Sequence, residues 1–389
     1  MLEREEFRTS PEIGFSNGPH APEGTRGMLE YPALTSMRDA LADEKNIDPL
    51  TSRKINTVIE HWRNDPNTVE PMAEMQNILE HARRIPRSDQ RVILMNTIVR
   101  TLGRPDTLAT FLDMLRDSAT RHGTREQEIC RLKLQNVKMH SIYGWCGNTL
   151  LVESFDQPTE GTHKTMLGLG ERLGNSTSAW NLTIHVWQPN LTAKGFPVNA
   201  TLESGVLIEP PHSHPFDFVS TVVKGVMHQS IYAQNNNVGL TPKDSNDRYG
   251  RTTLEHVDGV WPPHDFRETR TLETLEHRVL LNEGDSYYMP CDWIHDVEID
   301  GDTAVSKPTI TLFFSSEYMV MPHVYMTKAM ADFHERNPDI KRNGIPISEN
   351  AWHAKLKAIA RYLRGESTTL DLNEIVKYPG EYAFFHVNS

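Results

Sequence analysis

The sequence of 389 residues has little cysteine and no excess of positive charge. Its three cysteines, Cys130, Cys146 and Cys291, are too few and too scattered for a disulfide framework or a cysteine-rich zinc module, which fits a reducing compartment. Asp and Glu number 52 against 40 for Lys and Arg, a net charge of -12, and no basic run is long enough to follow a phosphate backbone. Nucleic acid is therefore not expected as a partner.

Long apolar runs are also missing. No stretch of about 18 apolar residues occurs, and the N-terminal segment has acidic residues where a secretion signal would carry basic and then apolar ones. We therefore expect a protein of the cytoplasm without a membrane partner. The sequence also lacks the GxGxxG, P-loop and HExxH patterns of nucleotide sites and zinc peptidases.

The composition and apolar spacing of the chain change along its length. Residues 1–35 are rich in Pro, Gly, Ser and charge without periodicity, which predicts a flexible arm. Apolar residues recur at helical spacing over 36–140, and this predicts an α-helical region. Short β-branched and aromatic runs over 141–325 predict a β-barrel, with a long insertion at about 235–276. Helical spacing returns over 326–389, so the fold class is α+β, with C-terminal helices packed on the barrel.

Two histidines stand two residues apart in "PPHSHPFDFVSTVVKG". Side chains alternate between the faces of a strand, so His212 and His214 are predicted to point the same way and to reach one ion. A third histidine follows in "GDSYYMPCDWIHDVEI", where Gly284 and Pro290 precede His295 in a strand, a tight turn and a returning strand. Without a metal, the same histidines would fill the polar core of a barrel.

These two stretches resemble the two motifs of the cupin superfamily over roughly residues 175–320. The first motif matches at Gly205, His212, His214 and Gly225, and the second at Gly284, Pro290 and His295. The resemblance implies a double-stranded β-helix barrel in which the three histidines hold one metal ion.

One position departs from the family pattern. Phe218 stands where the glutamate ligand of the first motif is usual, and Asp217, three residues after His214, is expected to face the other side of the strand. Three neutral imidazoles and no carboxylate resemble the site of the thiol dioxygenases, the cupin branch that holds ferrous iron. Because a 2-oxoglutarate site pairs two histidines with a carboxylate, that cosubstrate is not expected.

The resemblance also implies residues for the substrate. Arg172 lies near the place of the arginine that holds the substrate carboxylate in the thiol dioxygenases, although a surface arginine is the alternative. Phe218 is expected to contact the substrate beside the metal. Tyr288, His228 and Tyr232 are candidate catalytic residues if they face the barrel interior, and the alternative is that they satisfy polar groups of the barrel.

Together these features predict a mononuclear non-heme Fe(II) cupin oxygenase of the dioxygenase type. Its expected partners are dioxygen and a small anionic or chelating substrate, and a homodimer is left open. A non-redox metal-dependent isomerase, lyase or hydrolase is one alternative function. A small-molecule sensor that uses the helices as an interaction region is another.

Overall fold

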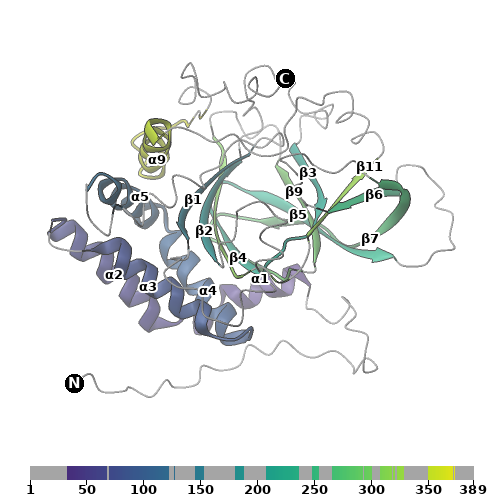
Figure 1. Cartoon of the computed structure of the whole chain (residues 1–389), viewed down its shortest axis with the longest axis horizontal. Coiled ribbons are helices and arrows are strands. Elements are labelled where there is room, and N and C mark those ends of the chain that lie inside the picture. The colour runs from purple at the N-terminus through teal and green to yellow at the C-terminus, as the bar shows by residue number, and fades with distance from the viewer. Residues whose placement is uncertain are drawn as a thin grey trace.

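The computed structural model combines helices with antiparallel sheets (Figure 1). It describes residues 33–67, 70–121, 127, 145–152, 180–187, 207–235, 248–253, 265–291, 293–299, 307–317, 319, 322–327, 349–370 and 372. The helices are α1 (Leu34–Ala42), the short 3-10 helix η2 (Glu44–Asn46), α2 (Pro49–Asn64), α3 (Pro71–Arg84), α4 (Asp89–Leu102), α5 (Pro105–Ala119) and α9 (Glu349–Leu363). The strands are β1 (Trp145–Val152), β2 (Asn181–Trp187), β3 (Leu207–His212), β4 (Phe218–Lys224), β5 (Met227–Asn235), β6 (Arg248–Thr253), β7 (Asp265–Leu281), β8 (Ser286–Met289), β9 (Ile294–Ile299), β10 (Thr309–Ser315) and β11 (His323–Thr327).

The strands form two groups of antiparallel pairs. Five of them make a sheet in the order β1-β2-β10-β4-β8. The other six pair in the order β11-β3-β9-β5-β7-β6, and β6 also pairs with β11, so that these pairings form a ring. The expected α+β class is confirmed. Helices α2 to α5 and α9 lie on one side of the five-stranded sheet, and the six-stranded group lies on the other (Figure 1).

Both faces of the five-stranded sheet are covered, and its side chains alternate between two separate cores. In β10, Leu312 and Phe314 belong to the apolar core shared with the helices, whereas Phe313 belongs to the core shared with the six-stranded group. In β4, Val219 faces the helices and Phe218 the second group. This explains why these strands have near-continuous apolar sequences.

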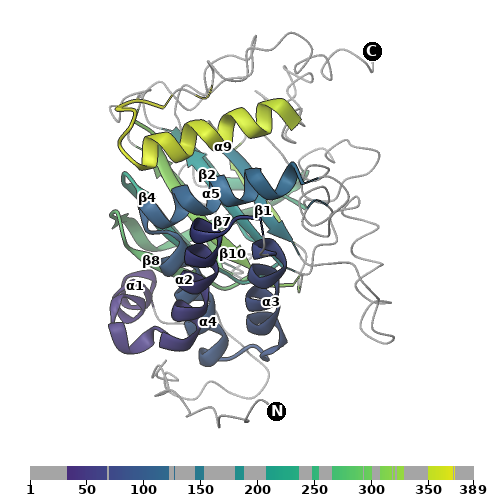
Figure 2. The same cartoon turned by 90° about the vertical axis from the view of Figure 1, so that its left-hand side faces the viewer.

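Helix α4 lies directly on the sheet, and most of its residues are buried. Ser88 caps its first turn by accepting a hydrogen bond from the Arg91 amide (3.4 Å), and Gly103 follows its last residue. Because α4 contacts the sheet on one side and helices α2, α3 and α5 on the others, it is buried almost all round, including its polar residues Arg91, Asn96, Thr97 and Thr101. Helix α9 packs on α5, which places the C-terminal helix against the helical layer (Figure 2).

The helical region begins at α1, close to the predicted end of the flexible arm. The carboxylate of Glu276 in β7 accepts hydrogen bonds from the Leu34 amide, the Thr35 amide (3.2 Å) and the Thr35 hydroxyl (2.7 Å). An acidic group at a helix N-terminus satisfies amides that lack helical partners. Leu34 is buried in the core of the second strand group, so α1 joins the helices to that group.

The stretch 235–276, predicted as a long insertion, contains β6 and most of β7. The side chains of 271–280 are half-buried or exposed, so this part of β7 lacks the apolar alternation by which a strand is usually recognised. The end of the helical region predicted for 36–140 lies outside the described residues beyond Arg121, apart from Gln127. No helix in the described ranges is long and apolar enough to cross a bilayer.

Two motif glycines have positive φ, which favours glycine, and they differ in their surroundings. A Cβ on Gly225 (φ +82°) would lie 2.8 Å from Thr309 Oγ1, whereas a Cβ on Gly284 (φ +91°) would meet nothing within 4 Å. We expect Gly284→Ala to lower the free energy of unfolding by about 1–2 kcal/mol through the backbone alone. Gly225→Ala should lower it further because of the clash. Urea unfolding measures both, and equal losses would contradict the packing described for Gly225.

Candidate metal centre

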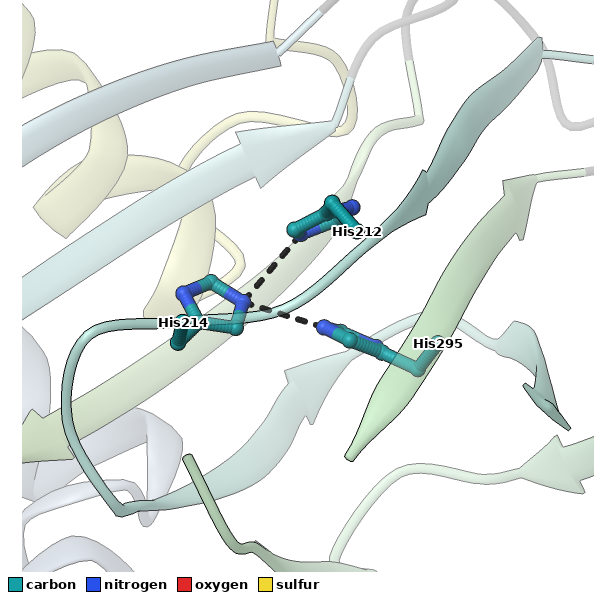
Figure 3. Close-up of side chains that lie close together, drawn as sticks. All are labelled: His212, His214 and His295. Atoms are coloured by element: carbon teal, nitrogen blue, oxygen red, sulfur yellow. Dashed lines mark hydrogen bonds between the residues drawn. The ribbon is translucent and has the colours of Figure 1, made fainter. Parts of the chain in front are cut away.

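Three histidines converge between the two strand groups (Figure 3). His212 is the last residue of β3 and His295 is the second residue of β9, and the two are direct partners in the β3–β9 register. His214 lies two residues beyond the end of β3. The ligand nitrogens of the three rings all lie within 4.8 Å of one another, and His212 and His295 are 8% and 2% exposed.

Hydrogen bonding determines which nitrogen of His212 faces the centre. Its Nδ1 lies 2.9 Å from the carbonyl oxygen of Pro210, which can only accept, so the ring proton belongs on Nδ1. The lone pair of Nε2 then points toward the other two histidines. His214 Nε2 lies 3.1 Å from His212 Nε2 and 3.0 Å from His295 Nε2. At most one of these two contacts can be a straight N–H···N bond, so a cation at the centre would satisfy the nitrogens better than a proton.

The spacing of these nitrogens suits a metal ion. At a metal–nitrogen distance of about 2.1 Å, two imidazole nitrogens at right angles on one ion lie about 3.0 Å apart. The separations of His214 Nε2 from the other two Nε2 atoms, 3.1 and 3.0 Å, match this value. The three residues could therefore hold one ion, and no carboxylate joins their group in the part of the chain that the structure describes.

The surroundings keep two of the rings neutral. Burial, followed by the neighbouring rings of His212 and His185, holds the pKa of His214 well below its usual value. Burial and the neighbouring rings of His212 and His214 do the same to the pKa of His295. Neutral imidazoles keep their lone pairs at neutral pH, which a metal ligand requires.

The segment that carries His214 is not a strand, which corrects the expectation of two histidines on one strand. It nevertheless alternates, because every second residue is hydrogen-bonded to the chain between β10 and β11. The bonds join Ser213 with His323 (2.9 and 3.1 Å), Pro215 with Met319 (2.6 Å) and Asp217 with Ser316 (2.8 and 3.0 Å). The residues between them, His214 and Phe216, are thereby turned toward the interior between the two strand groups, where their rings lie 5.4 Å apart.

Asp217 faces away from the three histidines, toward the helical layer. Its carboxylate accepts hydrogen bonds from Arg87 Nε (2.6 Å) and Nη2 (3.0 Å), and from the Cys291 amide (2.9 Å). Arg87 lies in the loop before α4, and Cys291 lies in the turn that leads to His295. The buried carboxylate of Asp217 therefore links the segments that carry His214 and His295 to the loop before α4.

The inward orientation expected for Tyr288 is wrong. Tyr288 belongs to the helix-side core, and its hydroxyl interacts with Asp217 and Arg87; burial, then the charge of Asp217, raises its pKa well above the usual value. Its neighbour Tyr287 faces the interior instead, with its ring 6.0 Å from that of Phe218. Burial raises the pKa of Tyr287 to about 12, so that it stays protonated. Tyr287 is paired with Ser220 in β4, a long-range register that no local pattern predicts.

His228 and Tyr232 were catalytic candidates only if they faced the interior, and β5 does not present them there. Met227 and Ile231 are the residues of β5 that enter the interior core, and the pairing of β5 with β7 is irregular on either side of Ile231. The hydroxyl of Tyr232 donates to the Asp296 carboxylate (2.6 Å), and Asp296 alternates with the inward His295. Neither predicted residue is thus brought to the three histidines.

Phe218 does face the candidate centre. Its ring lies 4.8 Å from that of His214 in an edge-to-face arrangement and 6.1 Å from that of His295. His185 also points inward, with its ring 5.4 Å from that of Phe313. Arg172 and Gly205 lie outside the described residues. Phe216 and Phe313 were missed by the sequence interpretation, although counting two residues from His214 indicates Phe216.

No protein-family model matches the sequence, and no curated protein matches it. Solved structures similar to the chain include an L-ribose isomerase mutant of Acinetobacter sp. DL28 in complex with L-ribose. Identity is 17%, the match covers 44% of this chain and 59% of the isomerase, less than two thirds of its length, and the TM-score is 0.23.

Two further solved structures are enzymes of other classes. A hydroquinone 1,2-dioxygenase in complex with Cd2+ and 4-hydroxybenzonitrile is 10% identical over 47% of this chain and 88% of that chain, with a TM-score of 0.18. A structure of DMSP lyases is 13% identical over 69% and 92%, with a TM-score of 0.20. With TM-scores below 0.5, none of these similarities assigns a family or an activity to this chain.

The three histidines should bind metal as one unit. Replacing His212, His214 or His295 singly by Ala should remove most bound metal, because a site with three protein ligands loses a third of its donors. His185→Ala is the control, since His185 contacts Phe313 in the same interior without belonging to the three-histidine group. Metal analysis of the purified variants measures this. Metal content near the native value in His295→Ala would contradict the assignment.

The contacts of Asp217 predict a specific effect on metal binding. Asp217→Asn should weaken zinc binding by about 10-fold or more, as is usual when the groups that orient metal ligands are removed. The control is Asp113→Asn, which removes a partner of Arg364 where α5 packs on α9, away from the histidines. Competition titration with a zinc chelator compares the two variants. Equal zinc affinities would show that Asp217 does not position the ligands.

Proposed function

We propose that this chain is a metal-dependent oxygenase in which His212, His214 and His295 hold one ferrous ion. Its substrates would be dioxygen and a small anionic or chelating molecule, without 2-oxoglutarate. The observation that carries the proposal is the convergence of three imidazole nitrogens with no carboxylate in their group among the described residues. A bound ferrous ion would supply the one-electron chemistry that dioxygen needs.

The charge of the site supports this choice of substrate. Three neutral imidazoles leave the double positive charge of a divalent ion uncompensated, so an anionic ligand is favoured beside it. The pKa values of His214 and His295 are held low, mainly by burial, so these two rings add no competing protons at neutral pH. Donor type alone selects no metal, since imidazole suits zinc, copper and iron.

The residues around the histidines suit a dry reaction site. Phe218, Phe313 and Tyr287 are between 3% and 7% exposed and lie on the same inner face. Their rings would exclude water from the substrate, which strengthens electrostatic interactions at the centre. Arg172 remains a proposed partner for a substrate carboxylate. Tyr288, His228 and Tyr232 receive no catalytic role, because their side chains do not reach the histidines.

The test of this function compares two metals. Protein loaded with ferrous iron should consume oxygen when screened against thiols, amino acids and phenols, and the zinc-loaded protein should not, because zinc has no accessible redox change. An oxygen electrode measures uptake, and chromatography measures loss of substrate in the same samples.

The opposite pattern would assign the protein to another class. Turnover by the zinc form without air would mean that the ion polarises a carbonyl or a leaving group, as in an isomerase, lyase or hydrolase. The same three histidines would then serve a non-redox reaction, and the oxygenase proposal would be wrong.

A further inference from the structure

Three phenylalanines form a continuous aromatic wall beside the candidate metal centre. The rings of Phe218 and Phe313 lie 4.9 Å apart, those of Phe216 and Phe313 5.7 Å apart, and those of Phe216 and Phe218 6.5 Å apart. Two of the three also touch a candidate ligand, since Phe216 lies 5.4 Å and Phe218 4.8 Å from the ring of His214. A molecule bound at His214 would therefore meet these rings.

The exposure of these side chains shows from which side such a molecule reaches the centre. Phe218 and Phe313 are 3% and 7% exposed, whereas His214 and Phe216 are only half-buried. The accessible part of the three-histidine group is thus His214, and the ring next to it on the same segment is Phe216. A ligand would approach beside Phe216 and lie between the nitrogens and the wall.

The aromatic surface continues beyond the wall into side chains with polar atoms. The ring of His185 lies 5.4 Å from that of Phe313 and 6.0 Å from that of Trp187. Burial lowers the pKa of His185 to about 4, so its imidazole carries no charge at neutral pH. It can donate a hydrogen bond to a ligand or accept one without adding a charge. This side of the site therefore suits a neutral, planar part of a ligand.

Aromatic rings bind other rings edge-to-face or offset at centroid distances of about 4.5–7 Å. The wall offers three rings at such spacing, while the three imidazoles offer a metal that prefers an anionic oxygen. We infer that the substrate is a small planar aromatic molecule with an acidic oxygen substituent, a phenolate or a carboxylate. The oxygen would lie toward the histidines, and the ring would lie against Phe216, Phe218 and Phe313. This inference rests on the proposed metal function for its metal-binding end.

The test uses two probes with the same metal-binding group, benzohydroxamate and acetohydroxamate, which differ by a phenyl ring in place of a methyl group. Calorimetry on zinc-loaded protein measures both without any redox reaction. We expect benzohydroxamate to bind about tenfold more tightly or better, since burying a ring against apolar walls contributes at least about 1.4 kcal/mol. Metal-free protein should bind neither probe comparably.

Adjacent residues on β10 provide a matched pair of variants. Phe313→Leu should reduce the preference for benzohydroxamate several-fold, while Phe314→Leu should leave it unchanged, because Phe314 packs against Trp180 on the helix side. Circular dichroism confirms folding. Phe216→Leu, at a half-buried position, replaces Phe313→Leu if the latter is unstable.

Each outcome either supports or overturns the assignment of an aromatic substrate. Equal affinity for the two probes in the native protein, or equal effects of the Phe313 and Phe314 variants, would overturn the aromatic assignment. Failure of zinc-loaded protein to bind either probe would overturn both this inference and the metal proposal. If the preference is present but the ferrous protein consumes no oxygen, the inference holds and the oxygenase function fails.

Discussion

The alternation of side chains across a sheet covered on both faces is the constraint on which the rest of the structure depends. Each of the strands β2, β4, β8 and β10 sends one set of residues into the helix-side core and the other into the interior, where the histidines lie. A shift of one residue in any of these strands would exchange the two sets. His212 and His295 lie on β3 and β9 of the other strand group, so the register of this sheet decides which side chains, such as Phe218, Phe313 and Tyr287, line the candidate centre.

The helical layer also reaches the centre by direct contacts. Arg87, before α4, binds Asp217, and Arg91, within α4, binds Glu317, so two arginines four residues apart hold the chain after His214 and the chain after β10. Burying such pairs costs desolvation, and they contribute less to stability than to the choice of one arrangement. We therefore interpret the helices as the scaffold that fixes where the ligands lie. The sheet alone would leave the segment 213–217 without its outer anchor.

The sequence was sufficient for the histidines and insufficient for their neighbours, for a physical reason. His212, His214 and His295 could be predicted because each lies in a short motif. The outward orientation of Asp217 could be predicted because it follows His214 by three residues, an odd number. The partner of Asp217, Arg87, lies 130 residues earlier in the chain, and no local sequence pattern predicts this contact. The sequence indicates that Tyr287 and Tyr288 face opposite sides of their strand. It does not indicate which of the two faces the interior, because the inner face is set by the pairing of Tyr287 with Ser220 in β4.

Strand orientation and exposure account for the other differences. Met227 and Ile231, four residues apart, take the inner face of β5, which leaves His228 and Tyr232 on the other face, and no local pattern predicts which face is inner. The exposed, charged residues of β7 lack the apolar alternation by which a strand is recognised. The α+β class was predictable because the apolar spacing typical of helices and the short apolar runs typical of strands occupy separate stretches of the chain. The double-stranded β-helix of the cupins and the ferrous oxygenase chemistry remain predictions.

The most direct test of the central claim is the X-ray absorption spectrum of the zinc-loaded protein, which reports the ligands of the ion itself. We predict three imidazole nitrogens at about 2.0–2.1 Å, with the remaining positions filled by water oxygen. A sulfur ligand near about 2.3 Å, or fewer than three imidazoles, would mean that the ion binds elsewhere on the chain and would contradict the account.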